Sequence, residues 1–121
     1  MASIIEVLEA ALGTDKIISG ENIPDDRRHD YWFISNLRDL QERGAPRPLC
    51  VARPSSAADV QQILNTAQTT KTAVIPFGLG SGVCGGVIAD AAGIMPAMSG
   101  MNKTEEHHDA NWLATVEAGP L

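Results

Sequence analysis

The chain has 121 residues, which allows one modest hydrophobic core but not two. Hydrophobic residues make up 44% of it and charged residues 20%, an ordinary globular composition that excludes a disordered or fibrous protein. The net charge of -6 argues against nucleic acid and against anionic membrane surfaces as partners.

The N-terminus and the cysteines indicate a cellular compartment. Residues 1–6 lack the basic region and sustained apolar core of a secretory signal. No run approaches the roughly 20 apolar residues that a membrane helix needs. Cys50 and Cys84 are the only cysteines, and we expect both to be free thiols in a reducing compartment. The expected location is therefore the cytoplasm.

Two helices are predicted in the first 48 residues. Ser3 and Glu6 have the spacing of a capping box, so a helix should begin there and end at Gly13. Residues 15–19 form a short apolar piece, and residues 20–26 are predicted to be a loop. Apolar residues recur at helical spacing between positions 31 and 42, which predicts the second helix.

A strand, a helix and a strand are predicted next. Residues 49–53 suit a brief edge strand that Pro54 stops. Ser55 or Ser56 then caps a helix, whose inward face would hold Val60, Ile63, Leu64 and Ala67. Residues 71–75 end in an apolar run typical of a buried strand. Two later strands, 92–98 and 111–118, are expected to be joined by a polar link at 103–109.

The glycine-rich loop at residues 76–86 is the candidate binding segment. It holds five glycines in eleven positions, which neither a helix nor a strand would tolerate. Glycines let backbone N–H groups converge on an anion, and this loop follows the carboxyl end of a predicted strand, where open α/β sheets place ligands. A simple turn would normally need only two glycines. We therefore expect the loop to bind phosphate.

The loop sequence can be compared with two known phosphate-binding motifs. A Walker A loop requires Lys and then Ser or Thr after its last glycine, whereas Val87 and Ile88 follow Gly86. That motif is excluded. Residues 80–85 match the G-x-G-x-x-G pattern of a dinucleotide-binding βαβ unit, although little chain separates Gly86 from Gly93 for the helix that should follow. The βαβ interpretation stays open as an alternative.

Four segments carry a family resemblance: RPSSAADV at 53–60, VIPFGLGSGVCGG at 74–86, MNK at 101–103 and TVEAG at 115–119. In this order they resemble the FAD-linked oxidases of the vanillyl-alcohol oxidase type. The resemblance covers residues 49–121. The preceding residues resemble the extension of the branch that holds alkyl-dihydroxyacetonephosphate synthase and the glycolate or lactate oxidases.

The resemblance implies an α+β fold, namely the first α/β subdomain of a two-subdomain PCMH-type FAD-binding fold, in a truncated chain. Residues 1–48 would be an N-terminal helical extension, and residues 49–121 a partial FAD-binding domain. The family's P-x-G-x-G-[ST] loop binds the FAD pyrophosphate through main-chain amides. This implies the same role for Pro76, Phe77, Gly78, Leu79, Gly80, Ser81 and Gly82.

The sequence departs from the family pattern just before the MNK segment. Pro96 lies within the predicted strand, where it removes a backbone donor, and Ala97 stands where the family usually has an aspartate. If the strand is central, this chain should pair it less well. Together with the short length, this departure suggests a truncated reading frame.

The expected function is the FAD-binding portion of a flavin-dependent oxidoreductase that oxidises a small hydroxylated substrate. The substrate would be bound only by the full-length enzyme, so this chain alone should lack turnover and no catalytic residue is assigned. The alternative is a non-catalytic nucleotide-binding or interaction module, or the product of a truncated gene. An apolar face left uncovered by a partial domain would favour self-association.

Other candidate residues have structural interpretations. Cys84 is expected to be a small buried residue rather than a flavin attachment point. His107 and His108 are expected in a solvated turn rather than at a metal. The aromatic residues 31–33 should pack on the core, and the mixed charges at 25–30 should form an exposed surface.

Overall fold

The computed structural model describes residues 2–119. Helix α1 (Ile4–Leu12) begins with the predicted capping box, in which the Ser3 hydroxyl accepts the Glu6 N–H and the Glu6 carboxylate accepts the Ser3 N–H. Gly13, with φ of 102°, ends the helix as predicted. Pro120 and Leu121, the last residues of the predicted partial domain, lie outside the described residues.

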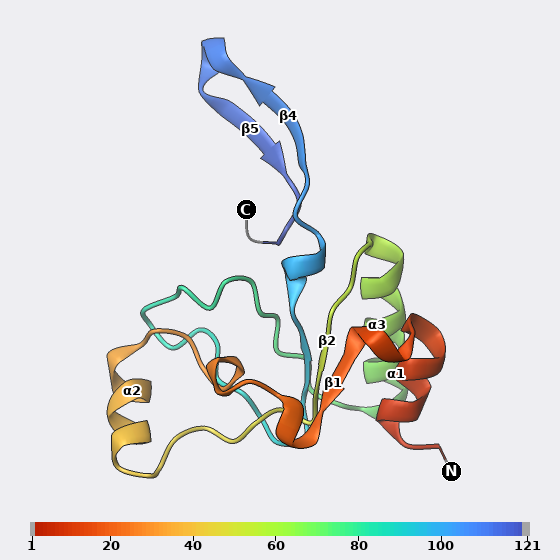
Figure 1. Ribbon diagram of the computed structural model, residues 1–121, viewed down its shortest axis with the longest axis vertical. Helices are drawn as coiled ribbons and strands as arrows, with labels where there is room; N and C mark the ends of the chain where they lie inside the picture. The colour runs from red at the N-terminus through yellow and green to blue at the C-terminus, as the bar shows by residue number, and fades with distance from the viewer. Residues whose placement is uncertain (1, 120–121) are drawn as a thin grey trace.

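A three-stranded sheet forms the centre of the fold (Figure 1). Its order is β1 (Ile17–Ser19), β2 (Cys50–Ala52), β3 (Ile94–Pro96), with β1 antiparallel and β3 parallel to β2. The strand at β2 is thus central, and our prediction of an edge strand is wrong. Pro54 lies beyond the last paired residue, so it takes no donor out of the ladder.

The segment 74–77 runs parallel to β3 as an incomplete fourth strand. Its pairing consists of two isolated bridges, Val74 with Ile94 and Phe77 with Ala97. The missing bond lies between them: Ile94 N–H donates to the Ala73 carbonyl, and two residues later Pro96 has no N–H for Ile75. The expected continuous buried strand is therefore replaced by an interrupted edge, and Pro96 is the reason.

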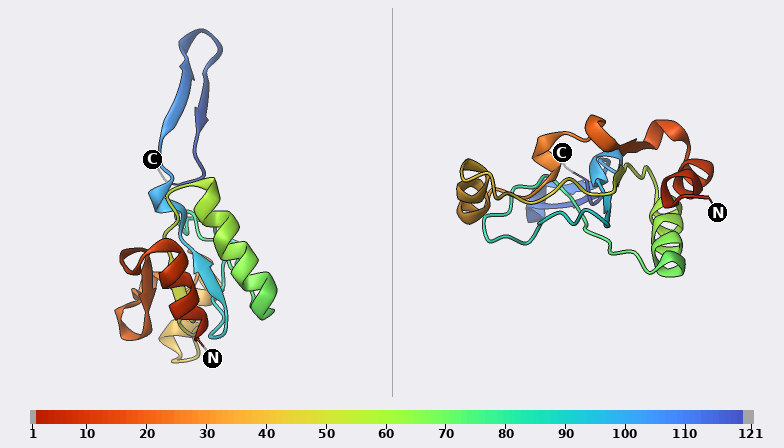
Figure 2. Two further views of the ribbon diagram at one scale, coloured as in Figure 1. Left: turned by 90° about the vertical axis from the view of Figure 1, so that its right-hand side faces the viewer. Right: turned by 90° about the horizontal axis from the view of Figure 1, so that it is seen from below.

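Two apolar clusters lie on opposite sides of the sheet. Helices α1 and α3 (Ala57–Thr70) cover one side together (Figure 2), and the first cluster comprises Leu8, Leu12, Ile17, Cys50, Ala52, Ile63, Ala67 and Ile94. The second cluster comprises Ile23, Val51, Phe77, Ala89, Met95 and Ala97. No α-helix among residues 2–119 contributes to this second cluster, so its core depends on Ile23 and on Phe77 and Ala89, which lie at the start of the glycine-rich loop and just after it.

Helix α3 begins at the predicted cap, with the Ser56 hydroxyl accepting the Asp59 N–H. Its buried residues are Ile63, Thr66 and Ala67, whereas Leu64, predicted to face inward, is 49% exposed. The buried face is therefore rotated toward Thr66.

Helix α2 (Phe33–Leu40) stands apart from the other two helices, across the glycine-rich loop (Figure 1). Tyr31 is 70% exposed and Phe33 is 71% exposed, so the expected burial of the aromatic residues is wrong for both. Leu40 is also exposed. Asp39 of this helix contacts Arg28 and His29 of the segment before it.

The C-terminal part of the described chain is a hairpin that projects from the body (Figure 1). It pairs β4 (Thr104–His108) with β5 (Leu113–Val116). The predicted polar link at 103–109 is therefore largely a strand, and β3 pairs elsewhere. Every residue of both strands is exposed. Across residues 2–119, the structure contains no helix with the length and apolarity required for a membrane crossing.

The predicted boundary at residue 48 stays a prediction. The preceding segment contains helices α1 and α2, and also strand β1, which joins the central sheet through Ile18 opposite Val51. The two predicted portions thus share one sheet and both apolar clusters.

Candidate functional site

The glycine-rich loop at residues 76–86 overlaps the end of the interrupted fourth strand, and no helix forms between the loop and residue 93. A dinucleotide-binding βαβ unit needs a helix directly after the third glycine of its pattern. Since no helix follows Gly85, the βαβ interpretation of residues 80–85 is excluded. The loop lies beyond the carboxyl ends of β3 and its neighbouring segment, which is the position expected from its sequence.

Phe77 anchors the beginning of the loop. Its side chain is 2% exposed in the second apolar cluster, its N–H donates to the Pro96 carbonyl over 2.9 Å, and its carbonyl accepts the Met98 N–H over 2.9 Å. The Arg27 guanidinium carbon lies 4.5 Å from the centre of its ring. Of the seven predicted site residues, Phe77 therefore serves as a core anchor through its side chain.

Gly78 and Gly80 differ in what they require. Gly80 has φ of +70°, and a Cβ there would lie 2.5 Å from the Phe77 ring, so the fold itself demands glycine. A Cβ at Gly78 would meet nothing within 4 Å, and its φ is not in the left-handed region. Within the described chain nothing requires glycine at position 78.

The amide groups of the loop are available for a ligand. Within residues 2–119, no backbone N–H from Gly78 to Gly86 donates to a protein acceptor, whereas those of Phe77 and Val87 on either side do. Leu79, Ser81, Gly82, Val83 and Cys84 are exposed. A run of unpaired N–H groups in an accessible loop is the donor set that an oxyanion such as phosphate needs.

The segment 28–31 forms backbone hydrogen bonds with residues 82–89, the second half of the loop and the residues after it. Tyr31 N–H donates to the Gly82 carbonyl over 2.8 Å, Asp30 N–H to the Val87 carbonyl over 3.0 Å, and Ala89 N–H to the Arg28 carbonyl over 2.8 Å. Asp30 is only 1% exposed. The predicted exposed charged surface at 25–30 is therefore wrong for Asp30, because its carboxylate is needed inside the loop.

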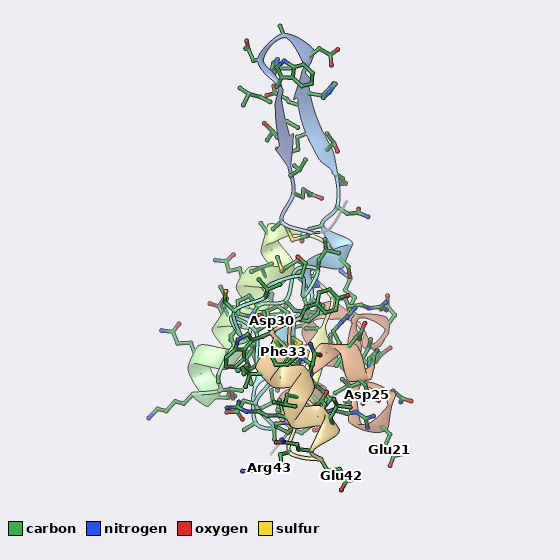
Figure 3. The ribbon with its side chains drawn as sticks, turned by 90° about the vertical axis from the view of Figure 1, so that its left-hand side faces the viewer. Glu21, Asp25, Asp30, Phe33, Glu42 and Arg43 are labelled. Atoms are coloured by element: carbon green, nitrogen blue, oxygen red, sulfur yellow. The ribbon has the colours of Figure 1, made fainter. Side chains whose placement is uncertain are left out.

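A polar network ties this segment to α2 (Figure 3, in which α2 faces the viewer). His29 Nε2 lies 2.8 Å from Asp39 Oδ2, and its Nδ1 lies 2.6 Å from the Asp30 carbonyl oxygen. Arg28 is 3.0 Å from the other Asp39 oxygen, close enough for an ion pair though not aligned as a hydrogen bond. Burial lowers the pKa of His29, but the hydrogen bonds to Asp30 and Asp39 and the Asp39 charge raise it above 6.5 overall.

A hollow of about 240 Å³ lies between this network and the loop, with Phe77, Leu79 and Gly80 on one wall. Asp25, Asp26 and Arg27 are also among its lining residues. Arg27 is the one Lys or Arg that lines this hollow within residues 2–119, and Asp26 pairs with it over 2.9 Å. Since the Asp26 carboxylate already pairs with this guanidinium, an anion at this loop would be held mainly by N–H dipoles rather than by side-chain charge.

The remaining sequence candidates lie away from this arrangement or contribute little. Cys84 is exposed on the loop, so the prediction of a buried packing role is wrong. His107 and His108 lie on strand β4 rather than in a turn, and the hollow of about 430 Å³ beside them is formed by the open face of the hairpin. Residues 2–119 contain no group of three or more His, Cys, Asp or Glu placed to hold a metal ion.

Sequence reasoning missed Asp30, Arg27 and Trp32 as parts of the site. Their partners lie about 50 residues later in the chain, and no local pattern marks such a pairing. The one available signal was the surplus of glycines, since a Cβ at Gly85 would lie 2.6 Å from the Trp32 ring and one at Gly82 would lie 2.9 Å from the Asp30 carboxylate. Part of the glycine density thus serves packing against residues 28–32.

Comparison with known proteins places these observations in a family. A family model described as FAD binding domain matches residues 48–120. The chain is 32% identical over 82 residues to D-2-hydroxyglutarate dehydrogenase of Xanthomonas citri pv. viticola, covering 68% of this chain and 17% of that protein. It is 24% identical over 106 residues to D-lactate dehydrogenase of Anaerostipes hadrus, covering 88% and 21% respectively.

Solved structures show the same fold at low identity. One of alkyldihydroxyacetonephosphate synthase superposes with a TM-score of 0.78 at 18% identity, covering 93% of this chain and 23% of that one. One of p-cresol methylhydroxylase with substrate bound gives a TM-score of 0.65 at 14% identity, covering 85% and 19% respectively. The predicted α+β, PCMH-type fold is confirmed. The chain spans about a fifth of the length of these relatives, 17% to 23%.

The predicted cofactor agrees with this assignment. The matched region contains the whole glycine-rich loop, with its unpaired amides. A relative from Mycobacterium tuberculosis, 28% identical over 109 residues and covering 89% of this chain and 22% of that protein, is named as an uncharacterized FAD-linked oxidoreductase. The expected resemblance is therefore confirmed: the chain belongs to the FAD-binding domain family, and FAD is its cofactor.

Proposed function

We propose that Pro76–Gly82 holds the pyrophosphate of FAD, in a flavin-dependent oxidoreductase that oxidises a small hydroxylated substrate. The observation that carries the proposal is the run of unpaired N–H groups from Gly78 to Gly86 in an accessible loop. Pyrophosphate oxygens accept several N–H donors, and the N–H groups of this loop have no protein acceptor within residues 2–119.

The individual residues have different roles in this proposal. Pro76 and Phe77 fix the start of the loop on the sheet edge, and Gly80 turns the backbone with a φ of +70°. Gly78 leaves open space for the phosphate to approach. Leu79, Ser81 and Gly82 contribute backbone donors, and the Ser81 hydroxyl is exposed beside them.

The bound flavin would supply the redox chemistry by accepting a hydride, while this chain contributes binding and orientation. Two relatives are named for the oxidation of 2-hydroxy acids, D-2-hydroxyglutarate and D-lactate. Their names support a small hydroxylated acid as the substrate of the intact enzyme. We assign substrate binding and turnover to that intact enzyme and no catalytic residue to the 121 residues described by the sequence.

The proposal is tested by titrating the chain with FAD while following flavin fluorescence and thermal unfolding. Gly78→Val places a side chain in open space, so the melting temperature should stay within about 2 °C while FAD affinity falls at least about tenfold. Ala91→Val adds bulk to an exposed turn outside the loop and should change neither quantity. Wild-type affinity in Gly78→Val would overturn the assignment of this loop.

Competition separates FAD binding from a general nucleotide-binding module. ADP contains the pyrophosphate and should compete with FAD, whereas riboflavin lacks it and should compete poorly at the same concentration. If ADP binds as tightly as FAD and no flavin effect is measurable, the non-catalytic nucleotide-binding alternative is favoured.

A further inference from the structure

The family match begins at residue 48, yet the loop takes its shape from residues before that point. Three backbone hydrogen bonds join the segment 28–31 to residues 82–89. Two of them, Asp30 N–H to the Val87 carbonyl and Ala89 N–H to the Arg28 carbonyl, flank an antiparallel bridge between His29 and Ile88. The end of the glycine-rich loop is therefore paired with the N-terminal segment like a short strand.

The Asp30 carboxylate lies within this pairing and connects its two sides. Oδ1 accepts the Trp32 N–H over 3.1 Å, and Oδ2 accepts the Val87 N–H over 3.3 Å. Because the residue is 1% exposed, water cannot replace either bond without opening the structure. One carboxylate thus fixes the backbone of the N-terminal segment and of the loop together.

The loop sequence is adapted to this carboxylate. A Cβ at Gly82 would lie 2.9 Å from Asp30 Oδ2, and one at Gly86 would lie 4.0 Å from the same oxygen. Gly85, with φ of +76°, similarly makes room for the Trp32 ring. Glycines 82 and 85 therefore make room for the Asp30 carboxylate and the Trp32 ring, while a Cβ at Gly78 would meet nothing within 4 Å.

The backbone N–H groups of the loop differ from that of Val87. The Val87 N–H is held by its carboxylate, whereas the N–H groups from Gly78 to Gly86 have no acceptor in the described chain. When several N–H donors bind one ligand, a loop that is already fixed in shape binds more tightly, because it loses less conformational entropy on binding. A loop held at Phe77 and again at Val87 has that geometry.

We propose that Asp30 is a positioning residue for the FAD loop: from outside the matched family region it holds the loop in the shape that presents its free N–H groups to the pyrophosphate. The ligand in this proposal rests on the proposed function, but the holding of the loop can be measured without ligand. Asp30 itself does not touch the phosphate in this proposal.

The test compares Asp30→Asn with Asp25→Asn. The amide of asparagine can accept from only one of Trp32 and Val87, so one buried N–H loses its acceptor in either orientation. Asp25→Asn removes the same charge from the wall of the same hollow, where the exposed Asp25 carboxylate pairs with Arg47. Hydrogen exchange is measured residue by residue without ligand, and FAD affinity is measured by fluorescence.

In Asp30→Asn, the amides of Tyr31, Val87 and Ala89 should exchange at least about tenfold faster while those of α1 and α3 keep their protection. FAD affinity should fall by at least about tenfold, and both readouts should stay at wild-type values in Asp25→Asn. Unchanged exchange at Val87 overturns the positioning role, as does faster exchange with unchanged FAD affinity.

Two further results keep the outcomes distinct. If Asp30→Asn unfolds the whole chain, Gly82→Ala is used instead. Its Cβ would lie 2.9 Å from Asp30 Oδ2 and should push the carboxylate away from Val87, although residue 30 is still aspartate. Unchanged hydrogen exchange at Val87 in this variant then overturns the proposal. If the wild type binds no FAD, the proposed function fails, and exchange in Asp30→Asn still decides whether Asp30 holds the loop.

Discussion

The imidazole of His29 lies 2.8 Å from the carboxylate of Asp39, and its second nitrogen faces the Asp30 carbonyl. Both neighbours are acceptors, so both ring nitrogens make good hydrogen bonds only when the imidazole is protonated. This contact connects α2 to the segment that holds the glycine-rich loop.

The first prediction is a loss of stability with rising pH. The pKa of folded His29 is raised above 6.5, so its contribution is fully present below the unfolded pKa and disappears as pH rises through the folded pKa. Unfolding by urea between pH 5 and pH 9 should show this decrease, and Asp39→Asn should flatten it. His107→Gln, at an exposed site on β4, is the control and should retain the wild-type dependence.

The second prediction concerns acid. The hydrogen bond from Lys16 is the largest cause that lowers the pKa of Asp59 to about 2 from 3.8. Its contribution is present above 3.8 and is lost as pH falls through about 2. Lys16→Met should cost about 1 kcal/mol or less at pH 7, because solvent screens this partly exposed pair. A cost that persists unchanged at pH 2 would contradict this account.

The third prediction tests the interrupted ladder. Pro96→Val supplies the N–H that the Ile75 carbonyl lacks, so the new amide should be protected from hydrogen exchange to the level of Ile94. Stability should change by less than about 1 kcal/mol, since the added hydrogen bond offsets the greater freedom of the unfolded chain. Rapid exchange at residue 96 would show that a cause other than proline interrupts the strand.

The fourth prediction concerns self-association through the hairpin. Trp112 is 95% exposed at the turn and has φ of 54°, which asparagine tolerates better than tryptophan. Trp112→Asn should therefore leave the melting temperature within about 2 °C while reducing any oligomer seen by sedimentation. If an oligomer is present and this variant does not reduce it, another surface mediates association.

Local patterns determined a large part of the fold. The capping box at Ser3 and the Ser56 cap both formed, because a cap depends on residues within one helical turn. The loop at 76–86 was also predictable, since consecutive glycines disfavour regular structure regardless of their surroundings. The resemblance carried by that loop led to the correct family and cofactor.

The failures involved contacts between distant residues. The position of β2 at the centre of the sheet depends on its pairing with β1 and β3, and no feature of residues 49–53 reveals both partners. The exposure of Phe33 depends on which part of the protein packs against α2. The helical spacing of apolar residues between positions 31 and 42 does not contain that information.

The sequence by itself thus determined a glycine-rich FAD-family loop, because its backbone freedom and its motif are local properties. Only the tertiary structure decided how that loop is held. The Asp30 carboxylate reaches Val87 across 57 positions of the chain, and it enters the loop because Gly82 has no side chain to exclude it. This contact exists only once folding has brought residues 30 and 87 together. The sequence of residues 25–30 therefore could not show that Asp30 is buried while its charged neighbours are more exposed.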